Sequence, residues 1–123
     1  MSSSTPTTSC IESVHAHGPD LVVRLRGEID VSTAPAITSY LDTLTPGHHA
    51  GLLIDLRHVT FMDGAGVRVL TRARAGQGGR LRLICTQSIT LRLLRHPSLR
   101  LHFEILDRLP PSAPRTVWPR ACP

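Results

Sequence analysis

Hydrophobic and polar positions change their spacing along the chain, and each spacing predicts a different secondary structure. Leu21, Val23 and Leu25 recur at a period of two, which is typical of a strand with one buried face. Apolar residues from Ile37 to Leu44 instead recur at intervals of three and four, which is typical of an amphipathic helix. The patterns along the whole chain predict strands at 10–16, 20–26, 51–56, 80–85 and 102–106, and helices at 34–44, from Asp63 to Gly76, and at 88–95.

The predicted elements follow one another in the order β-β-α-β-α-β-α-β. A helix between two strands implies a parallel pair with a right-handed crossover. The nearly continuous apolar run at 51–56 is typical of a central strand. Val22, Arg24 and Arg26 alternate with the apolar set of their strand, and strand 80–85 alternates in the same way, so one largely wet face is expected. We therefore expect a single α/β domain with a mixed four- to five-stranded sheet and helices mainly on one face.

The chain has 123 residues, enough for one hydrophobic core. Residues 10–107 form the expected domain, preceded by a flexible N-terminus at 1–9. Residues 108–123 contain five prolines and no periodicity, which predicts a flexible proline-rich tail. Trp118, the only tryptophan, lies in this tail. It is interpreted either as an anchor for a partner or as a lightly ordered tail side chain.

The chain is strongly basic, but the distribution of its charges argues against a nucleic-acid-binding protein. All fourteen basic residues are arginine, the net charge is +5, and the isoelectric point is near 10.4. The arginines are scattered, and aromatic residues make up only 3% of the chain, so a platform for stacking bases is missing. No direct nucleic-acid partner is expected.

The sequence shows no feature of a membrane, secreted or metal-binding protein. No apolar run approaches the ~20 residues needed to cross a bilayer, and the first ten residues lack the features of a secretory signal. Cys10, Cys85 and Cys122 show neither a CxxC motif nor metal-ligand spacing. We expect a cytoplasmic protein with no membrane association, no metal and no cofactor.

One turn, Asp63-Gly64-Ala65-Gly66, is unusually bare of side chains. Asp63 stands where a helix N-cap belongs, and its carboxylate is expected to accept from the backbone of the next turn. The small residues after it suit an anion or the close approach of another protein, and they equally suit tight packing of the helix on the sheet. A dinucleotide fingerprint is disfavoured because no third glycine follows at the needed position. A Walker-type loop is excluded because the chain has no lysine.

Two segments, "VVRLRGEIDVSTAPAI" and "LLIDLRHVTFMDGAGVRVLTRARA", together resemble the STAS domain of the anti-sigma factor antagonists. That family has a Gly-Glu-Leu-Asp element before its first helix, which matches Gly27 to Asp30 here. It also has an apolar strand ending in Asp, which matches Asp55. Its Asp-Ser-Ser-Gly or Asp-Ser-Thr-Gly turn matches Asp63 to Gly66. The resemblance spans about residues 10–107 and keeps the order of the elements.

The resemblance implies a partner, an anti-sigma factor that is itself a serine-kinase-like regulator. In the family, this kinase phosphorylates a Ser or Thr at the position matching Ala65, and phosphorylation breaks the complex. Ala65 has no hydroxyl, so the phosphate acceptor is absent, although Asp63 and Gly66 on either side still match the family motif. Ser32, Thr33 and Thr60 are the candidate substitute phosphosites, or else cap and turn residues, with Ser32 or Thr33 expected to cap the helix at 34–44. The surface expected to bind the partner comprises Asp30, Ser32, Thr33, Asp63, Gly64, Ala65, Gly66, Val67 and Arg68.

The leading hypothesis is a non-catalytic regulatory binding module, monomeric or weakly dimeric, that binds an anti-sigma factor and releases a sigma factor without phospho-switching at position 65. One alternative is a STAS scaffold subunit of a larger signalling or stress-sensing assembly. A further alternative is a small enzyme that uses Asp63, or Asp55 with Asp30. No His or second carboxylate stands at a recognisable catalytic spacing, so no catalytic residue is predicted.

Overall fold

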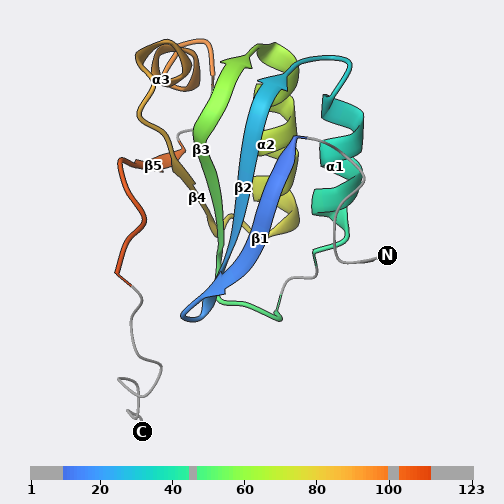
Figure 1. Cartoon of the computed structure of the whole chain (residues 1–123), viewed down its shortest axis with the longest axis vertical. Helices are drawn as coiled ribbons and strands as arrows, with labels where there is room; N and C mark the ends of the chain where they lie inside the picture. Colours follow the sequence, from blue (N-terminus) through green and yellow to red (C-terminus); the bar gives the residue numbers. More distant parts are fainter. Residues whose placement is uncertain (1–9, 45–46, 100–102, 112–123) are drawn as a thin grey trace, which may run out of the picture.

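The computed structural model describes residues 10–44, 47–99 and 103–111, and its elements follow the predicted order (Figure 1). Each predicted strand and helix is present, with bounds that shift by a few residues. The elements are β1 (Ile11–His17), β2 (Asp20–Ile29), α1 (Ala34–Asp42), β3 (Leu52–Met62), α2 (Gly64–Gly76), β4 (Leu81–Ile84), α3 (Ser88–Leu94) and β5 (Glu104–Leu106).

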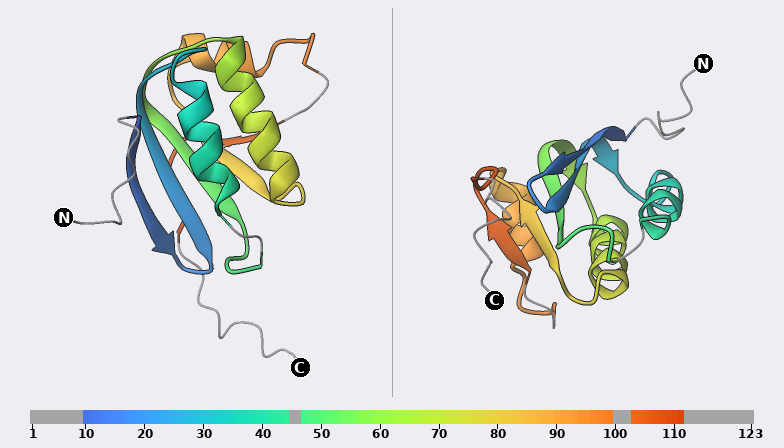
Figure 2. Two further views of the ribbon diagram at one scale, coloured as in Figure 1. Left: turned by 90° about the vertical axis from the view of Figure 1, so that its right-hand side faces the viewer. Right: turned by 90° about the horizontal axis from the view of Figure 1, so that it is seen from below.

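The five strands form one mixed sheet in the order β1-β2-β3-β4-β5. β1 and β2 form an antiparallel hairpin, and the pairs from β2 to β5 are parallel, each joined by one helix. Since right-handed crossovers in a sequential sheet place their helices on the same face, α1, α2 and α3 all contribute to the main hydrophobic core on that face (Figure 2). The predicted α/β class, mixed sheet and one-sided helices are confirmed.

β3 is the central strand, as its apolar run predicted, and it is longer than predicted. Leu52, Ile54 and Leu56 are almost completely buried in the main core. The strand then continues beyond the predicted end to Met62, because its second half still pairs with β2, through two shifts in register that precede the pair of Ile29 with Met62. This extension carries the chain to the start of α2.

The face opposite the helices is not as wet as predicted, because a second small core lies on it. Val22, expected on the wet face, is fully buried together with Leu53 and Ile84, and Leu106 and Leu109 pack against them. Further along the same strand, Arg24 is only half-buried, as the alternation predicted. The second core therefore covers part of this face with chain that follows β5.

The start of the predicted tail contacts the sheet. Leu109 packs on the second core, and the carbonyl oxygen of Pro110 lies 2.6 Å from Nε2 of His17 at the end of β1. This imidazole nitrogen donates in the hydrogen bond, because a carbonyl oxygen can only accept. The rest of the predicted tail, 112–123 with Trp118, and the predicted N-terminus at 1–9 lie outside the described residues.

Candidate partner-binding surface

The loop after β2 and the turn after β3 lie side by side at one end of the sheet, where α1 and α2 both begin (Figure 1). The pairing of Ile29 with Met62 brings the two strand ends together. The backbone nitrogen of Asp63 also donates to the carbonyl of Ile29 at 3.3 Å. The two predicted motifs therefore meet, at the carboxyl ends of parallel strands where open α/β sheets commonly bind their ligands.

The loop after β2 is ordered by its own hydrogen bonds. Oδ1 of Asp30 accepts from the Ser32 hydroxyl at 2.6 Å, from the Ser32 backbone nitrogen at 2.9 Å and from the Thr33 nitrogen at 3.3 Å. The hydrogen bond from the Ser32 hydroxyl, with those from the backbone, lowers the pKa of Asp30 from its usual value. The loop is thus folded with a fixed charge before any partner arrives.

Thr33 stands at the N-cap of α1, but neither of the two expected hydroxyls caps this helix. The Thr33 hydroxyl instead donates to the carbonyl of Glu28 at 2.9 Å and accepts from the Asp30 nitrogen at 3.0 Å. The Ser32 hydroxyl is engaged by Asp30. The expectation of a Ser32 or Thr33 side-chain cap is therefore wrong, because both hydroxyls close the loop rather than the helix.

Asp63 caps α2 as the sequence predicted. Its backbone is extended and its Oδ1 accepts from the backbone nitrogen of Ala65 at 2.9 Å. The cap satisfies one of the helix's otherwise unpaired N–H groups. That N–H group is therefore not free for an anion, which favours a protein partner over a small anionic ligand at this turn.

The two glycines of the turn differ in what surrounds them. A methyl group on Gly66 would collide with Cγ of Met62 and lie 3.2 Å from Cγ2 of Ile29, so this glycine allows α2 to pack on the ends of β2 and β3. A methyl group on Gly64 would meet only a guanidinium nitrogen of Arg68, at 4.0 Å. Packing therefore explains Gly66, whereas Gly64 is exposed and bare on the outer surface.

Ala65 lies in a groove of about 510 Å³ between α1 and α2, with only 7% of the residue exposed. Val31 and Val69 contribute apolar surface to the groove. Arg72 Nη2 binds Asp42 Oδ2 at 2.8 Å and so links the two helices along it. Position 65 thus lines a partly apolar groove and is itself almost fully buried.

Not every residue of the predicted surface is available to a partner. Val67 is buried in the main core, and Gly66 is buried against Met62. Both were included because they adjoin the bare turn, and the helical spacing of α2 turns them inward. Ser32, Gly64 and Arg68 are exposed, and Arg68 forms no ion pair within the described part of the chain.

Comparison with known proteins shows which family this chain belongs to. The model of the STAS domain family matches residues 11–109. The chain belongs to this family. It is 27% identical over 99 residues to the anti-sigma-F factor antagonist RsfB of Mycobacterium tuberculosis, covering 79% of this chain and 81% of RsfB.

Solved structures of anti-sigma factor antagonists have the same fold as this chain. An anti-sigma factor antagonist from Mycobacterium paratuberculosis matches with a TM-score of 0.70 and 26% identity, over 79% of this chain and 85% of that one. Unphosphorylated SpoIIAA, an anti-sigma factor antagonist, shares the fold with a TM-score of 0.56 at 23% identity, over 79% of this chain and 88% of its own. The predicted resemblance is confirmed, and these relatives support a regulatory binding role for this STAS domain.

Three large apolar side chains are exposed on the described part of this STAS domain, and only Val31 lies in a loop, Asp30 to Thr33, that the sequence predicts to bind the partner. Val31 is 74% exposed, Phe61 49% and Ile89 77%. Each lies close to the carboxyl end of a parallel strand: Val31 after β2, Phe61 at the end of β3, and Ile89 at the start of α3 after β4. Their signal in the sequence is an apolar residue at a strand-to-helix junction, outside the periodic pattern of either element.

Asp55, half of one proposed catalytic pair, has a structural role. Its carboxylate is buried and binds Arg24 Nε at 3.1 Å, Arg57 Nε at 3.0 Å and Arg57 Nη2 at 2.9 Å. Burial raises the pKa of Asp55, but the hydrogen bonds from Arg57 and Arg24 outweigh this effect and hold the pKa below its usual value. Both oxygens are occupied, so the carboxylate lacks a free acceptor site for a substrate proton.

Residues 10–44, 47–99 and 103–111 contain no group of three or more His, Cys, Asp or Glu side chains that could hold a metal ion. Within the same ranges, no helix has the length and apolar character needed to cross a membrane.

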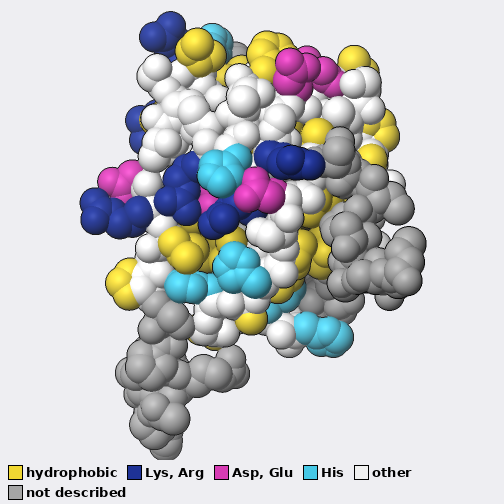
Figure 3. Space-filling model, viewed as in Figure 1, with side chains coloured by type: hydrophobic (Ala, Val, Ile, Leu, Met, Phe, Trp, Pro, Cys, Tyr) yellow, Lys and Arg dark blue, Asp and Glu magenta, His cyan; other side chains and the backbone are white. Residues whose placement is uncertain are grey.

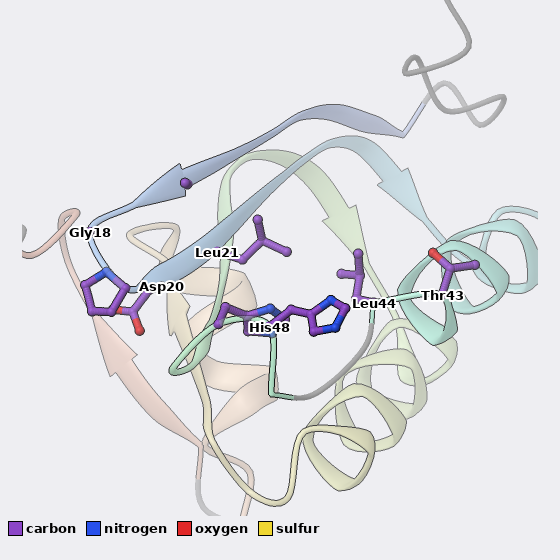
Figure 4. A pocket seen from close by; sticks show the side chains of 9 residues that line it. Gly18, Asp20, Leu21, Thr43, Leu44 and His48 are labelled. Carbon is purple, nitrogen blue, oxygen red and sulfur yellow. The ribbon is translucent and has the colours of Figure 1, made fainter. Parts of the chain in front are cut away.

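A second pocket, of about 360 Å³, lies at the opposite end of the sheet (Figure 4). It is formed between the β1–β2 turn, the end of α1 and the loop before β3, with Leu21, Leu44 and His48 among its lining residues. Asp20, also in its lining, is already paired with Arg82 at 2.8 Å. Since neither loop of the candidate surface contributes to this pocket, it is not part of that surface.

Proposed function

We propose that this STAS domain is an anti-sigma factor antagonist that binds a kinase-like anti-sigma factor in the cytoplasm and thereby releases a sigma factor. The observation that carries the proposal is the pairing of two prefolded elements at one end of the sheet. These elements are the loop closed by Asp30 and the α2 start capped by Asp63. Both match motifs of the antagonist family, and the similarity to RsfB supports the same class of partner.

The proposed antagonist does not carry a phospho-switch at position 65. Ala65 has no hydroxyl, and it lines the α1–α2 groove. A kinase partner therefore has no acceptor at the family position. The domain, acting as a monomer or weak dimer, stays in its binding-competent form.

The test uses the anti-sigma factors of the bacterium that carries this chain, each purified and titrated by calorimetry. One of them should bind the wild-type domain. Ala65→Glu and Arg68→Glu should each weaken that complex about tenfold or more, because the first fills the α1–α2 groove with a charged side chain and the second reverses an exposed charge beside it. Arg80→Glu is the matched control, because Arg80 is exposed just before β4, at the other end of that strand from the candidate surface.

Two results would contradict the proposal. Binding that is unchanged in both Ala65→Glu and Arg68→Glu would show that the partner uses another surface. No binding to any anti-sigma factor would favour the scaffold alternative, in which the domain is a subunit of a larger assembly. Folding of each variant is checked by its thermal unfolding, so that loss of binding is not loss of structure.

A further inference from the structure

The outer face of α3 carries an exposed apolar residue beside two arginines. Thr90 and Leu94 turn inward and are buried. Ile89, 77% exposed, and the exposed Arg92 and Arg95 turn outward. A single exposed apolar residue is ordinary on a protein surface, but this one is the most exposed large apolar side chain among the described residues.

The charge of this face is uncompensated. Neither Arg92 nor Arg95 forms an ion pair with the described residues, and the segment 85–99 contains no Asp or Glu. In the space-filling view, basic, apolar and histidine side chains are visible at the end of the molecule where α3 lies (Figure 3). A partner that covers this face must supply acidic groups around an apolar contact, because an unpaired buried guanidinium is costly.

α3 is held firmly against the strand that leads to the candidate surface. The side-chain nitrogen of Gln87, the residue before α3, lies 2.7 Å from the carbonyl of Leu56, 3.0 Å from that of Arg57 and 2.6 Å from that of Val59. These carbonyls belong to the middle of β3, which continues through Phe61 to the helix cap. The starts of α3 and α2 are therefore both connected to β3.

We propose that the outer face of α3 is a second part of the docking surface and that it receives an acidic, apolar-centred patch of the anti-sigma factor. The inference rests on the proposed function and adds a contact outside the two family motifs. Ile89 supplies the apolar contact, while Arg92 and Arg95 supply the charge. Through this contact the domain distinguishes an anti-sigma factor with acidic groups at that position from one without them.

The experiment measures the affinity of the full chain for the anti-sigma factor that binds it, at low and at high salt. Ile89→Ser should weaken the complex about fivefold at both salt concentrations, because it removes an apolar contact. Arg92→Glu should weaken it about tenfold at low salt and much less at high salt, because screening removes the effect of the charge. Arg80→Glu, the same charge reversal at a distant exposed arginine, should leave the affinity within about twofold.

Each outcome separates this inference from the proposed function. If Ala65→Glu and Arg68→Glu weaken the complex and the α3 variants do not, the proposed function stands and the α3 contact is wrong. If no anti-sigma factor binds the wild-type chain, both fail. If Arg92→Glu abolishes binding to a DNA duplex and leaves the anti-sigma factor affinity unchanged, the face serves nucleic acid and the inference is overturned. Arg92→Gln removes the positive charge without adding an acid. Thermal unfolding of Arg92→Gln and Arg92→Glu shows whether the added acid weakens the helix.

Discussion

The backbone nitrogen of Ala65 lies 2.9 Å from Oδ1 of Asp63, so the one position that lacks the family's hydroxyl is hydrogen-bonded to the helix cap. A phosphate at this position would add about −1.5 to −2 charges beside an existing carboxylate. The N-terminus of α2 would offset part of the repulsion. In this chain the charge cannot be placed there, although the cap and the groove that would surround it are present.

Ala65→Ser restores the hydroxyl with a single added oxygen. We expect the variant to fold normally, because it adds only one oxygen at a position that lines the α1–α2 groove. With the cognate kinase-like anti-sigma factor, ATP and magnesium, the variant should gain one phosphate, detected by intact-protein mass spectrometry. Its complex should then weaken, while unphosphorylated Ala65→Ser should bind like the wild type.

The wild-type chain should gain no phosphate under the same conditions. Phosphate mapped to Ser32, Thr33 or Thr60 would show that the switch has moved. The Ser32 and Thr33 hydroxyls already donate to Asp30 and to the carbonyl of Glu28, so a kinase would have to break the loop to reach them. Thr60 is exposed on β3 with no hydrogen bond from its hydroxyl to a described residue, so it is the substitute acceptor to map first.

Gly66→Ala and Gly64→Ala form a matched pair. Gly66→Ala forces a methyl group against Met62 and Ile29 and should lower the free energy of unfolding by about 1–3 kcal/mol. Gly64→Ala adds its methyl group in open space and should be neutral or raise it by up to about 1 kcal/mol, because alanine favours the helix. Urea unfolding of the two variants measures the difference. Equal effects would contradict the separate reasons assigned to the two glycines.

The order of elements and the fold class follow from the sequence, because periodicity reports which face of each element is buried. The length of β3 does not follow from the sequence, since its second half mixes polar and apolar residues and pairs with β2 only through shifts in register. The burial of Val22 does not either, because the residues that cover it, Leu106 and Leu109, come from the far end of the chain. Such long-range contacts leave no local pattern.

The candidate site could likewise be predicted from the sequence only in part. The Asp63 cap follows from local helix chemistry, and the structure has it as predicted. The inward direction of Val67 depends on how α2 rests on the sheet. The exposure of Ile89 depends on which side of α3 packs on the core. Neither the direction of Val67 nor the exposure of Ile89 can be predicted from the residues of one helical turn.

Asp63→Ala removes the side-chain cap of α2 and should lower the free energy of unfolding by about 1 kcal/mol. Asp63→Asn retains an oxygen that can accept from the Ala65 nitrogen and should lose much less. Because the cap also shapes the docking surface, the alanine variant should bind the anti-sigma factor more weakly than the asparagine variant. Equal stability of both variants and the wild type, measured by urea unfolding, would contradict a role for the Asp63 side chain as a cap.

Asp55 should make folding sensitive to acid. The net effect of its surroundings lowers its pKa from the usual value of 3.8, since the guanidinium groups of Arg57 and Arg24 outweigh burial. A carboxylate whose pKa is lower when folded stabilises the fold fully above its unfolded pKa, and this stabilisation is lost as the pH falls through the folded pKa. The free energy of unfolding should therefore decline below about pH 4, and less so in Asp55→Asn.

At neutral pH, Asp55→Ala leaves two half-buried guanidinium groups without their shared acceptor. The loss should be about 3 kcal/mol, at the lower end of the range for a broken buried pair because both arginines retain some contact with water. Asp42→Ala is the control, since it also removes an arginine partner, but the Asp42–Arg72 pair is exposed and its loss should be close to the error of the measurement. Chemical unfolding of the two variants at low and moderate salt measures both. If Asp55→Ala is no more destabilising than Asp42→Ala, the Asp55 carboxylate does not stabilise the fold as proposed.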